Sequence, residues 1–256
     1  MQSRTDADDT IDDTSETTAD RHPPGDLERL RPTFFADQLA DPTDVFFVNI
    51  GANDGVENDP IFESLQFYGW SGLAVEPNPA TAELLRANMR GFDGVEVTTT
   101  AIGERSERQE FFTIPAERAG PDPAWASQVC SLSRSYVHDA IGNVRAIGNY
   151  DLPDDLESHI ESTVVEVSSL PDLLRRHDVA RVDVINIDTE GYNAIVFRQL
   201  DLERWAPAVI VLEFADMTDA EQTEAVARLV DAGYERTRFF GWWSWVYTRT
   251  NPPRPA

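Results

Sequence analysis

The stretch VFFVNIGANDG (residues 45–55) runs from a strand-like segment directly into a loop that contains two glycines. Apolar and β-branched residues dominate its first half, as in a strand buried on both faces of a sheet. Gly51 and Gly55 permit positive φ angles and a close approach of a ligand to the backbone. The helix expected next directs free N–H groups and its positive dipole end at the same space. We therefore expect this loop to bind a carboxylate or phosphate group, with a ligand-free structural turn as the alternative.

Strand-like and helix-like segments alternate along the rest of the chain. Apolar strands are expected at 45–50, 71–77, 94–103, 181–191 and 207–215, and helices at 59–69, 78–90 and 219–233. Additional strands are expected at 108–115 and 162–170, on either side of a polar insertion of about 116–161. The segments 234–240 and 242–249, joined through Gly241, are typical of an antiparallel hairpin. This pattern predicts an α/β fold with a doubly wound, mostly parallel Rossmann-like sheet and a C-terminal hairpin, whose ligands bind beyond the carboxyl ends of the strands.

The two ends of the chain differ in composition from its middle. Residues 1–25 are rich in Asp and Thr and end in Pro-Pro-Gly, so we expect a disordered acidic arm. Residues 250–256 are interpreted as a disordered tail in the same way. Between them, residues 26–249 are long enough for one globular domain with room for an insertion.

The charge balance is strongly acidic. The 256 residues include 46 Asp and Glu against 21 basic residues, all of them arginine, for a net charge of −25. Such a chain repels a phosphate backbone, so we expect no nucleic-acid partner. At molar salt the Debye length falls to about 3 Å and screens the self-repulsion. We therefore expect a protein from a halophilic organism, with arginine codons of a high-GC genome as the alternative.

Cysteine usage and the apolar runs bear on the compartment. Cys130 is the single cysteine, so no internal disulfide forms. The N-terminus lacks the basic and apolar regions of a signal peptide, and the longest apolar runs are of strand length. We expect a cytoplasmic protein without a membrane span, and the sequence does not indicate its oligomeric state.

A second strand end suggests what the glycine loop binds. Glu76 follows Gly55 by one helix and one strand, where an acidic side chain accepts hydrogen bonds from both hydroxyls of an adenosine ribose. The alternative for Glu76 is a charge that complements a helix dipole. The loop has Gly-x-x-x-Gly instead of the nicotinamide fingerprint Gly-x-Gly-x-x-Gly, so a nicotinamide enzyme is disfavoured. The two strand ends together predict a nucleoside site.

Four ordered segments carry a family resemblance: VNIGANDG (48–55), GLAVEPNP (72–79), TTAIG (99–103) and VINIDTEG (184–191). They resemble the FkbM family of S-adenosylmethionine-dependent methyltransferases, whose usual pattern is close to DVGANxG, EPNP, AVG and KIDVEG. The resemblance spans roughly residues 44–215. It implies a class I methyltransferase fold, S-adenosylmethionine as cofactor and transfer of a methyl group to oxygen.

The same resemblance implies roles for individual residues. It places the methionine end of the cofactor on the loop Gly51 to Gly55, which includes Asn53, its ribose on Glu76, and its adenine edge against Ala101 and Ile102. Asn49 stands where the family commonly has Asp, and makes a neutral contact where Asp would pair with the cofactor's ammonium group. Asn78 of the EPNP segment, which also caps the next helix, completes the expected cofactor-binding set. Asn58, just beyond the loop, is expected to face the site.

Asp188 and Glu190 are the expected catalytic residues. Both follow a buried strand, where they would hold the ammonium group of the cofactor or the hydroxyl of the acceptor. For each, the alternative is a purely structural role, such as capping the next helix. Asp188, Glu213 and Asp216 also offer the oxygen ligands that Mg²⁺ prefers. An acidic chain carries many carboxylates, and no histidine has the spacing of a zinc ligand, so we expect no metal site.

The polar insertion is the expected site of acceptor recognition. It contains Ser, Arg, Tyr and Asn near a Ser-Leu-Ser segment (131–133) that resembles one common in the family. His138 and His159 could reach the site as a base, but solvated histidines are the expectation, and Trp242, Trp243 and Trp245 are expected to pack on the sheet. We therefore predict an O-methyltransferase acting on a hydroxyl of a saccharide (glycan) or small metabolite. The alternative is a catalytically idle binding or scaffold protein, which Asn49 slightly favours.

Overall fold

The computed structural model describes residues 38–121, 123–148, 151–241 and 243–249. The acidic arm expected at 1–25, the tail expected at 250–256 and Trp242 lie outside the described residues.

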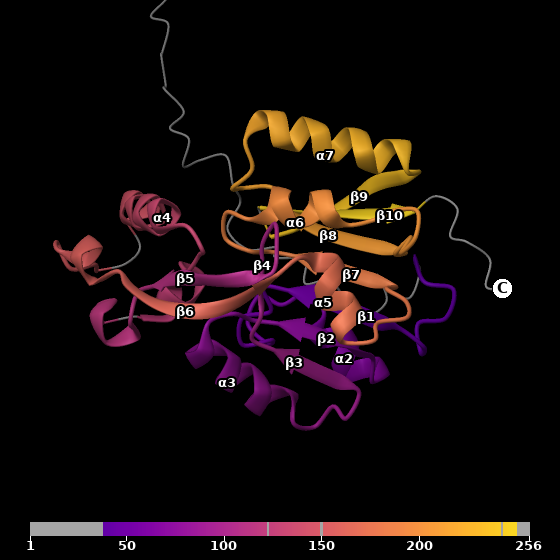
Figure 1. The fold of residues 1–256 in the computed structure, drawn as a ribbon, viewed down its shortest axis with the longest axis horizontal. Helices are drawn as coiled ribbons and strands as arrows, with labels where there is room; N and C mark the ends of the chain where they lie inside the picture. Colours follow the sequence, from indigo (N-terminus) through magenta and orange to yellow (C-terminus); the bar gives the residue numbers. More distant parts are fainter. Residues whose placement is uncertain (1–37, 122, 149–150, 242, 250–256) are drawn as a thin grey trace, which may run out of the picture.

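A seven-stranded sheet forms the centre of the fold (Figure 1). Its strands are β1 (Phe46–Ile50), β2 (Ser71–Val75), β3 (Val95–Thr98), β7 (Val184–Ile187), β8 (Val209–Glu213), β9 (Tyr234–Phe240) and β10 (Ser244–Arg249). Their order is β3-β2-β1-β7-β8-β10-β9. The first five are parallel, whereas β10 runs antiparallel to both β8 and β9. The structure thus confirms the expected doubly wound, mostly parallel sheet with a C-terminal hairpin, and its strand order reverses between β1 and β7.

Helices cover both faces of this sheet. Their bounds are α2 (Phe62–Tyr68), α3 (Pro79–Met89), α5 (Leu170–Arg176), α6 (Asn193–Gln199) and α7 (Asp219–Asp231). Val48 and Ile50 of β1 belong to a core cluster that also takes residues from α5, α6 and α7. The alternate residue Phe47 belongs to a second cluster with residues of α2 and α3. Both faces of the central strands are therefore buried, which explains their predominantly apolar sequences.

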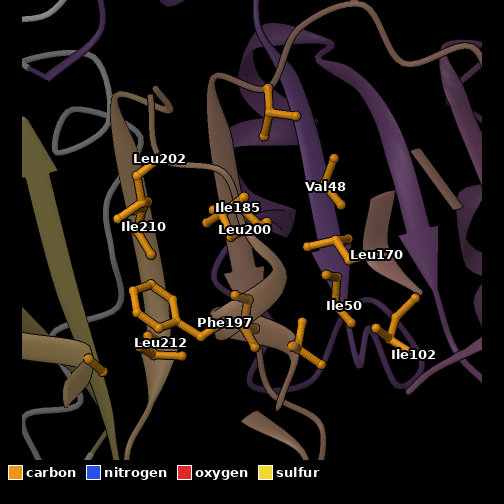
Figure 2. Packing of buried hydrophobic residues seen from close by; sticks show 14 of the residues in the cluster. Val48, Ile50, Ile102, Leu170, Ile185, Phe197, Leu200, Leu202, Ile210 and Leu212 are labelled. Atoms are coloured by element: carbon orange, nitrogen blue, oxygen red, sulfur yellow. The ribbon is translucent and has the colours of Figure 1, made fainter. Parts of the chain in front are cut away.

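Figure 2 shows part of the first cluster. Phe197 of α6 and Leu170 of α5 lie on the layer of side chains that Ile50, Ile185 and Ile210 contribute from three adjacent strands. Burial of each such side chain contributes about 1.5–3 kcal/mol, so this layer fixes the spacing of the strand ends above it.

A small second sheet stands beside the first. It contains β4 (Ala101–Ile102), β5 (Glu107–Thr113) and β6 (Glu161–Ser168) in the order β4-β6-β5. The single strand expected at 94–103 was wrong, because β3 pairs with β2 whereas β4 pairs with β6. The chain changes sheets at Thr99 and Thr100, where polar threonines interrupt the apolar run.

The segment between β5 and β6 is mostly helical where it is described. It contains three short 3-10 helices and α4 (Arg134–Ile147), which lies beside β5 (Figure 1). Its apolar side chains, including Trp125, Val137 and Ile141, form a cluster of their own. The insertion boundaries of about 116–161 stay a prediction. Among the described residues, no helix has the length and apolar character needed to cross a bilayer.

Candidate functional site

A cavity of about 360 Å³ opens at the carboxyl ends of β1, β2 and β7. This is the point where the strand order reverses, which is where open α/β sheets bind ligands. The loops after the strands form its floor, and α4 forms one wall through side chains that include Tyr136, Asn143 and Val144. Residues that are far apart in the chain therefore meet in one space.

The loop after β1 passes close to the backbone that follows β7. The N–H groups of Gly51 and Ala52 both donate to the carbonyl of Val75, at 2.9 and 3.0 Å. Gly51 has a φ of 81°, and a Cβ atom at this position would lie 1.5 Å from the carbonyl oxygen of Asp188. The missing side chain thus makes room for the neighbouring backbone, while the loop backbone from Gly51 to Asn53 lines the cavity.

Glu76 forms a bridge between two loops at the cavity. Its Oε2 accepts a hydrogen bond from the Asn53 N–H at 3.0 Å, and its Oε1 accepts one from the Asn78 N–H at 2.8 Å. Only 4% of the residue is exposed. Burial raises the pKa of Glu76 to about 7, against the lowering effect of both hydrogen bonds, and the nearby charge of Asp188 raises it further. Glu76 is therefore a carboxyl group whose ionisation costs free energy in this buried position.

Asn49 lies beneath the cavity and not in it. Its side-chain Nδ2 donates to Asp59 Oδ2 at 2.5 Å, and its Oδ1 accepts from Asn186 Nδ2 at 2.9 Å. Asp59 also accepts from the backbone N–H groups of Ile61 and Phe62 at the start of α2. Burial raises the pKa of Asp59 to about 6. Asn49 is thus the centre of a buried polar chain whose two ends, Asp59 and Asn186, line the cavity.

Asp188 shares a hydrogen bond with the carboxyl group of Glu213 at the end of β8. Burial raises the pKa of Asp188 to about 6. Burial, followed by the charge of Asp188, raises the pKa of Glu213 well above its usual value. Glu213 Oε2 also accepts a hydrogen bond from Asn193 Nδ2 at 2.6 Å. The hydrogen bond lowers the pKa of Asp188 and raises that of Glu213, so a proton shared by the pair resides preferentially on Glu213.

Glu190 faces a second carboxyl group across the hydroxyl of Tyr136. The Tyr136 oxygen lies 2.5 Å from Glu190 Oε2 and 2.5 Å from Asp216 Oδ2. Burial and the charge of Asp188 raise the pKa of Glu190 well above its usual value, and burial raises that of Asp216. The phenol of Tyr136 keeps its proton, because burial and both carboxylates raise its pKa.

The charges of the cavity have one sign. Its described lining includes seven acidic residues and no Arg or His: Glu57, Asp59, Glu76, Asp188, Glu190, Glu213 and Asp216. Within the same described part of the chain, no three Asp, Glu, His or Cys side chains are placed as ligands of a metal ion. In addition, the side-chain Oδ1 of Asn53 is buried there without a hydrogen-bond partner. A ligand that carries positive charge and hydrogen-bond donors would satisfy these groups.

The structure brings together most of the residues named from the sequence. The expected residues that line the cavity are Gly51, Asn53, Asn58, Glu76, Ala101, Ile102, Asp188 and Glu190. Three expected cofactor-binding residues lie outside its lining: Asn49, Gly55 and Asn78. A Cβ atom at Gly55 would meet Leu85 and Met89. The Asn78 side chain accepts from the Ala80 N–H at the start of α3, as expected for a helix cap. His138 and His159 do not line the cavity either.

Sequence reasoning missed several residues of the lining, among them Asp59, Asn186, Tyr136 and Trp243. Asp59 and Asn186 left a usable signal, because an Asn within the apolar strand 184–187 requires a polar partner. Tyr136 left none, since its partners are 54 and 80 residues away in the chain. Trp243 lines the cavity, whereas Trp245 packs on Phe214 as expected, with ring centroids 5.3 Å apart.

Comparisons with known proteins agree with this arrangement. A family model of the methyltransferase FkbM domain matches residues 49–236. Methyltransferase 1 of Beauveria bassiana (strain ARSEF 2860) is 24% identical over 187 residues, which cover 70% of this chain and 70% of that protein.

Solved structures give weaker similarities. An FkbM methyltransferase from Methylobacillus flagellatus KT has 11% identity and a TM-score of 0.48, over 85% of this chain and 50% of that one. This chain therefore spans about half the length of that protein. Aeropyrum pernix fibrillarin, solved with natively bound S-adenosyl-L-methionine, has 11% identity and a TM-score of 0.39, over 84% of this chain and 71% of that one. Because the family model matches well over half of the sequence, the chain belongs to the FkbM methyltransferase family.

Proposed function

We propose that this protein transfers a methyl group from S-adenosylmethionine to a hydroxyl oxygen of a saccharide or small metabolite. The observation that carries the proposal is the position of Glu76, whose buried carboxyl group lies in the cavity beside the loop Gly51 to Asn53. Family membership supports methyl transfer as the reaction.

The residues of the cavity fit this cofactor. S-adenosylmethionine carries an ammonium group, a sulfonium group and one carboxylate, so its net charge is positive, opposite to that of the lining. The carboxyl of Glu76 offers acceptors for the ribose hydroxyls, and Asn53 Oδ1 offers an acceptor without a partner. Ala101 and Ile102 supply an apolar edge for the adenine. When bound, the cofactor would supply an activated methyl group on a positively charged sulfur.

The protein's part in the reaction is alignment and removal of the acceptor proton. We assign these tasks to Asp188 and Glu190, whose carboxyl groups lie in the same cavity. The pKa of Asp188, raised to about 6, lies near the operating pH that a general base requires, and burial raises the pKa of Glu190 in the same direction. The wall from α4, with Asn143 and Tyr136, provides polar groups for a hydroxylated acceptor.

The idle-scaffold alternative loses its main support in the structure. Asn49 is the residue that favours it, but Asn49 lies outside the cavity lining and both ends of its amide are hydrogen-bonded, to Asp59 and to Asn186. An intact Glu76 and Asp188 within the cavity favour an enzyme.

The first test is calorimetric titration of S-adenosylmethionine and S-adenosylhomocysteine into the protein in molar KCl. We expect both to bind the wild type, and neither to bind Glu76→Ala. Glu83→Ala is the matched control, because Glu83 is an exposed residue on α3 outside the cavity. Equal affinity of wild type and Glu76→Ala would refute the ribose assignment. Absence of binding by folded wild type would favour the scaffold. Transfer of a labelled methyl group to a panel of saccharides and metabolite alcohols would then identify the acceptor.

The acidic composition supports a further part of the proposal, that the protein works at high salt. We propose a halophilic source and a cytoplasmic location, since a net charge of −25 is best screened in concentrated salt.

A further inference from the structure

Tyr136 joins α4 to the loop after β7 at several points. Its ring lies against Gly191, where a Cβ atom would come within 2.6 Å of it. The Ser131 hydroxyl donates to the carbonyl oxygen of Glu190 at 2.8 Å. Ser133 caps α4 by accepting from the Tyr136 N–H at 3.2 Å. These contacts fix the Tyr136 hydroxyl within the cavity.

The hydroxyl group has two acceptors and one hydrogen. Glu190 and Asp216 each place a carboxyl oxygen 2.5 Å from it. The tyrosine hydrogen can be donated to only one of them, so the other short contact needs a proton on the carboxyl group itself. The Glu190–Asp216 pair therefore holds one extra proton and carries one negative charge.

Other ionisable groups around this pair are acids as well. Glu76 follows β2 and Asp188 follows β7, and the charge of each raises the pKa of Glu190. Glu213 ends β8, and burial and the charges of Asp188, Glu190 and Asp216 raise its own pKa. Cys130, on the segment before α4, has a raised pKa through its own burial and is not ionised. No described Arg or His lines the cavity to compensate these charges. The Tyr136 hydroxyl lowers the pKa of both Glu190 and Asp216, against their burial, and a backbone hydrogen bond from Gly191 also lowers that of Asp216.

We infer that Tyr136 is a positioning residue which keeps one negative charge on the Glu190–Asp216 pair, and that this charge makes the cavity favour the methyl donor over its spent product. The inference rests on the proposed function. As the methyl group leaves, the carbon–sulfur bonding pair stays on sulfur and the acceptor proton passes to a carboxylate. The cofactor thereby changes from a net charge of one to zero, and loses the attraction that Tyr136 maintains. The same hydroxyl would thus promote exchange of product for fresh donor.

The test compares two affinities in the 256-residue chain. S-adenosylmethionine and S-adenosylhomocysteine are titrated by calorimetry into wild type, Tyr136→Phe and Tyr234→Phe at about pH 8, where most ordinary carboxyls are ionised. Tyr234 is the matched control, because its buried hydroxyl donates to the Pro207 carbonyl at 2.8 Å and does not line the cavity. We expect the affinity ratio, donor over product, to fall about tenfold in Tyr136→Phe, the size of effect expected for one charge across a half-buried cavity. Tyr234→Phe should keep the wild-type ratio. A purely structural role would weaken both ligands equally.

The pH dependence provides a second readout. When the pH is lowered from about 8, the wild-type ratio should fall as the pair gains its second proton, and this fall should be smaller in Tyr136→Phe. The double variant Glu190→Gln with Asp216→Asn removes the negative charge of the pair directly. Its affinity ratio should also fall, and it tests the inference if Tyr136→Phe does not fold. An unchanged ratio in either folded variant would overturn the inference. If neither ligand binds folded wild type, the proposed function itself fails.

Discussion

Glu76→Gln should change how the stability of the protein depends on pH. The folded-state pKa of Glu76 is about 7, against an ordinary value of 4.5, and burial is the main cause. The folded protein therefore holds this proton more tightly than the unfolded chain. The resulting stabilisation is fully present below the ordinary pKa and is lost as pH rises through the folded one. The interval between the two values corresponds to about 3 kcal/mol in the free energy of unfolding.

The assay is denaturant unfolding in molar KCl, monitored by tryptophan fluorescence. It is carried out at about pH 5 and about pH 8, which together span most of the interval between the two pKa values of Glu76. Wild type should lose up to about 3 kcal/mol more than Glu76→Gln between these conditions, because glutamine does not titrate. Asp188 and Asp59 titrate in both proteins, so the difference isolates Glu76. Glu83→Gln, at an exposed position, should follow wild type. Equal pH dependence in wild type and Glu76→Gln would show that Glu76 is not a protonated buried carboxyl group.

Three other substitutions or conditions test the fold around the site. Gly51→Ala should cost at least about 3 kcal/mol, because its Cβ would meet the Asp188 carbonyl oxygen; Gly69→Ala, at a similar φ with open space around it, should cost only about 1 kcal/mol in the same unfolding assay. Asn49→Asp should destabilise the protein by about 2–4 kcal/mol, since it replaces a donor to Asp59 with a second carboxylate; tighter S-adenosylmethionine binding by this variant would contradict the buried role of Asn49. Raising KCl from about 0.1 M to about 2 M should increase the midpoint of thermal unfolding, because salt screens the net negative charge; a constant midpoint would argue against that repulsion.

Much of the fold could be predicted because its central strands have a distinctive apolar sequence. Residues 45–50, 184–187 and 209–213 are apolar except for one polar residue each, which is typical of strands covered on both faces. The hairpin at Gly241 could also be predicted from the sequence. The break between β3 and β4 could not be predicted, because the local sequence does not indicate which sheet a strand joins.

The site could be predicted only in part. Gly51, Glu76 and Asp188 follow strands whose ends must meet, so their proximity comes from topology alone. Asn49 and Gly55 belong to the same motif but turn toward the packed layers beneath, and a motif does not record which way each residue points. Tyr136 depends on how α4 docks, and docking follows from long-range packing of the Trp125 and Ile141 cluster.

The loops beneath the cavity are tied to one another by main-chain atoms. The Gly51 N–H donates to Val75, the Glu76 N–H to Thr98 and the Asp188 N–H to Ile50, at 2.9–3.0 Å. Such bonds survive the exchange of almost any side chain, whereas α4 is held by its own apolar cluster and a few side-chain contacts. Substitutions in the α4 wall can therefore leave the floor of the cavity unchanged. Under the proposed function the α4 wall contacts the acceptor, so a chimaera that exchanges the segment before β6 is a natural starting point for redesign.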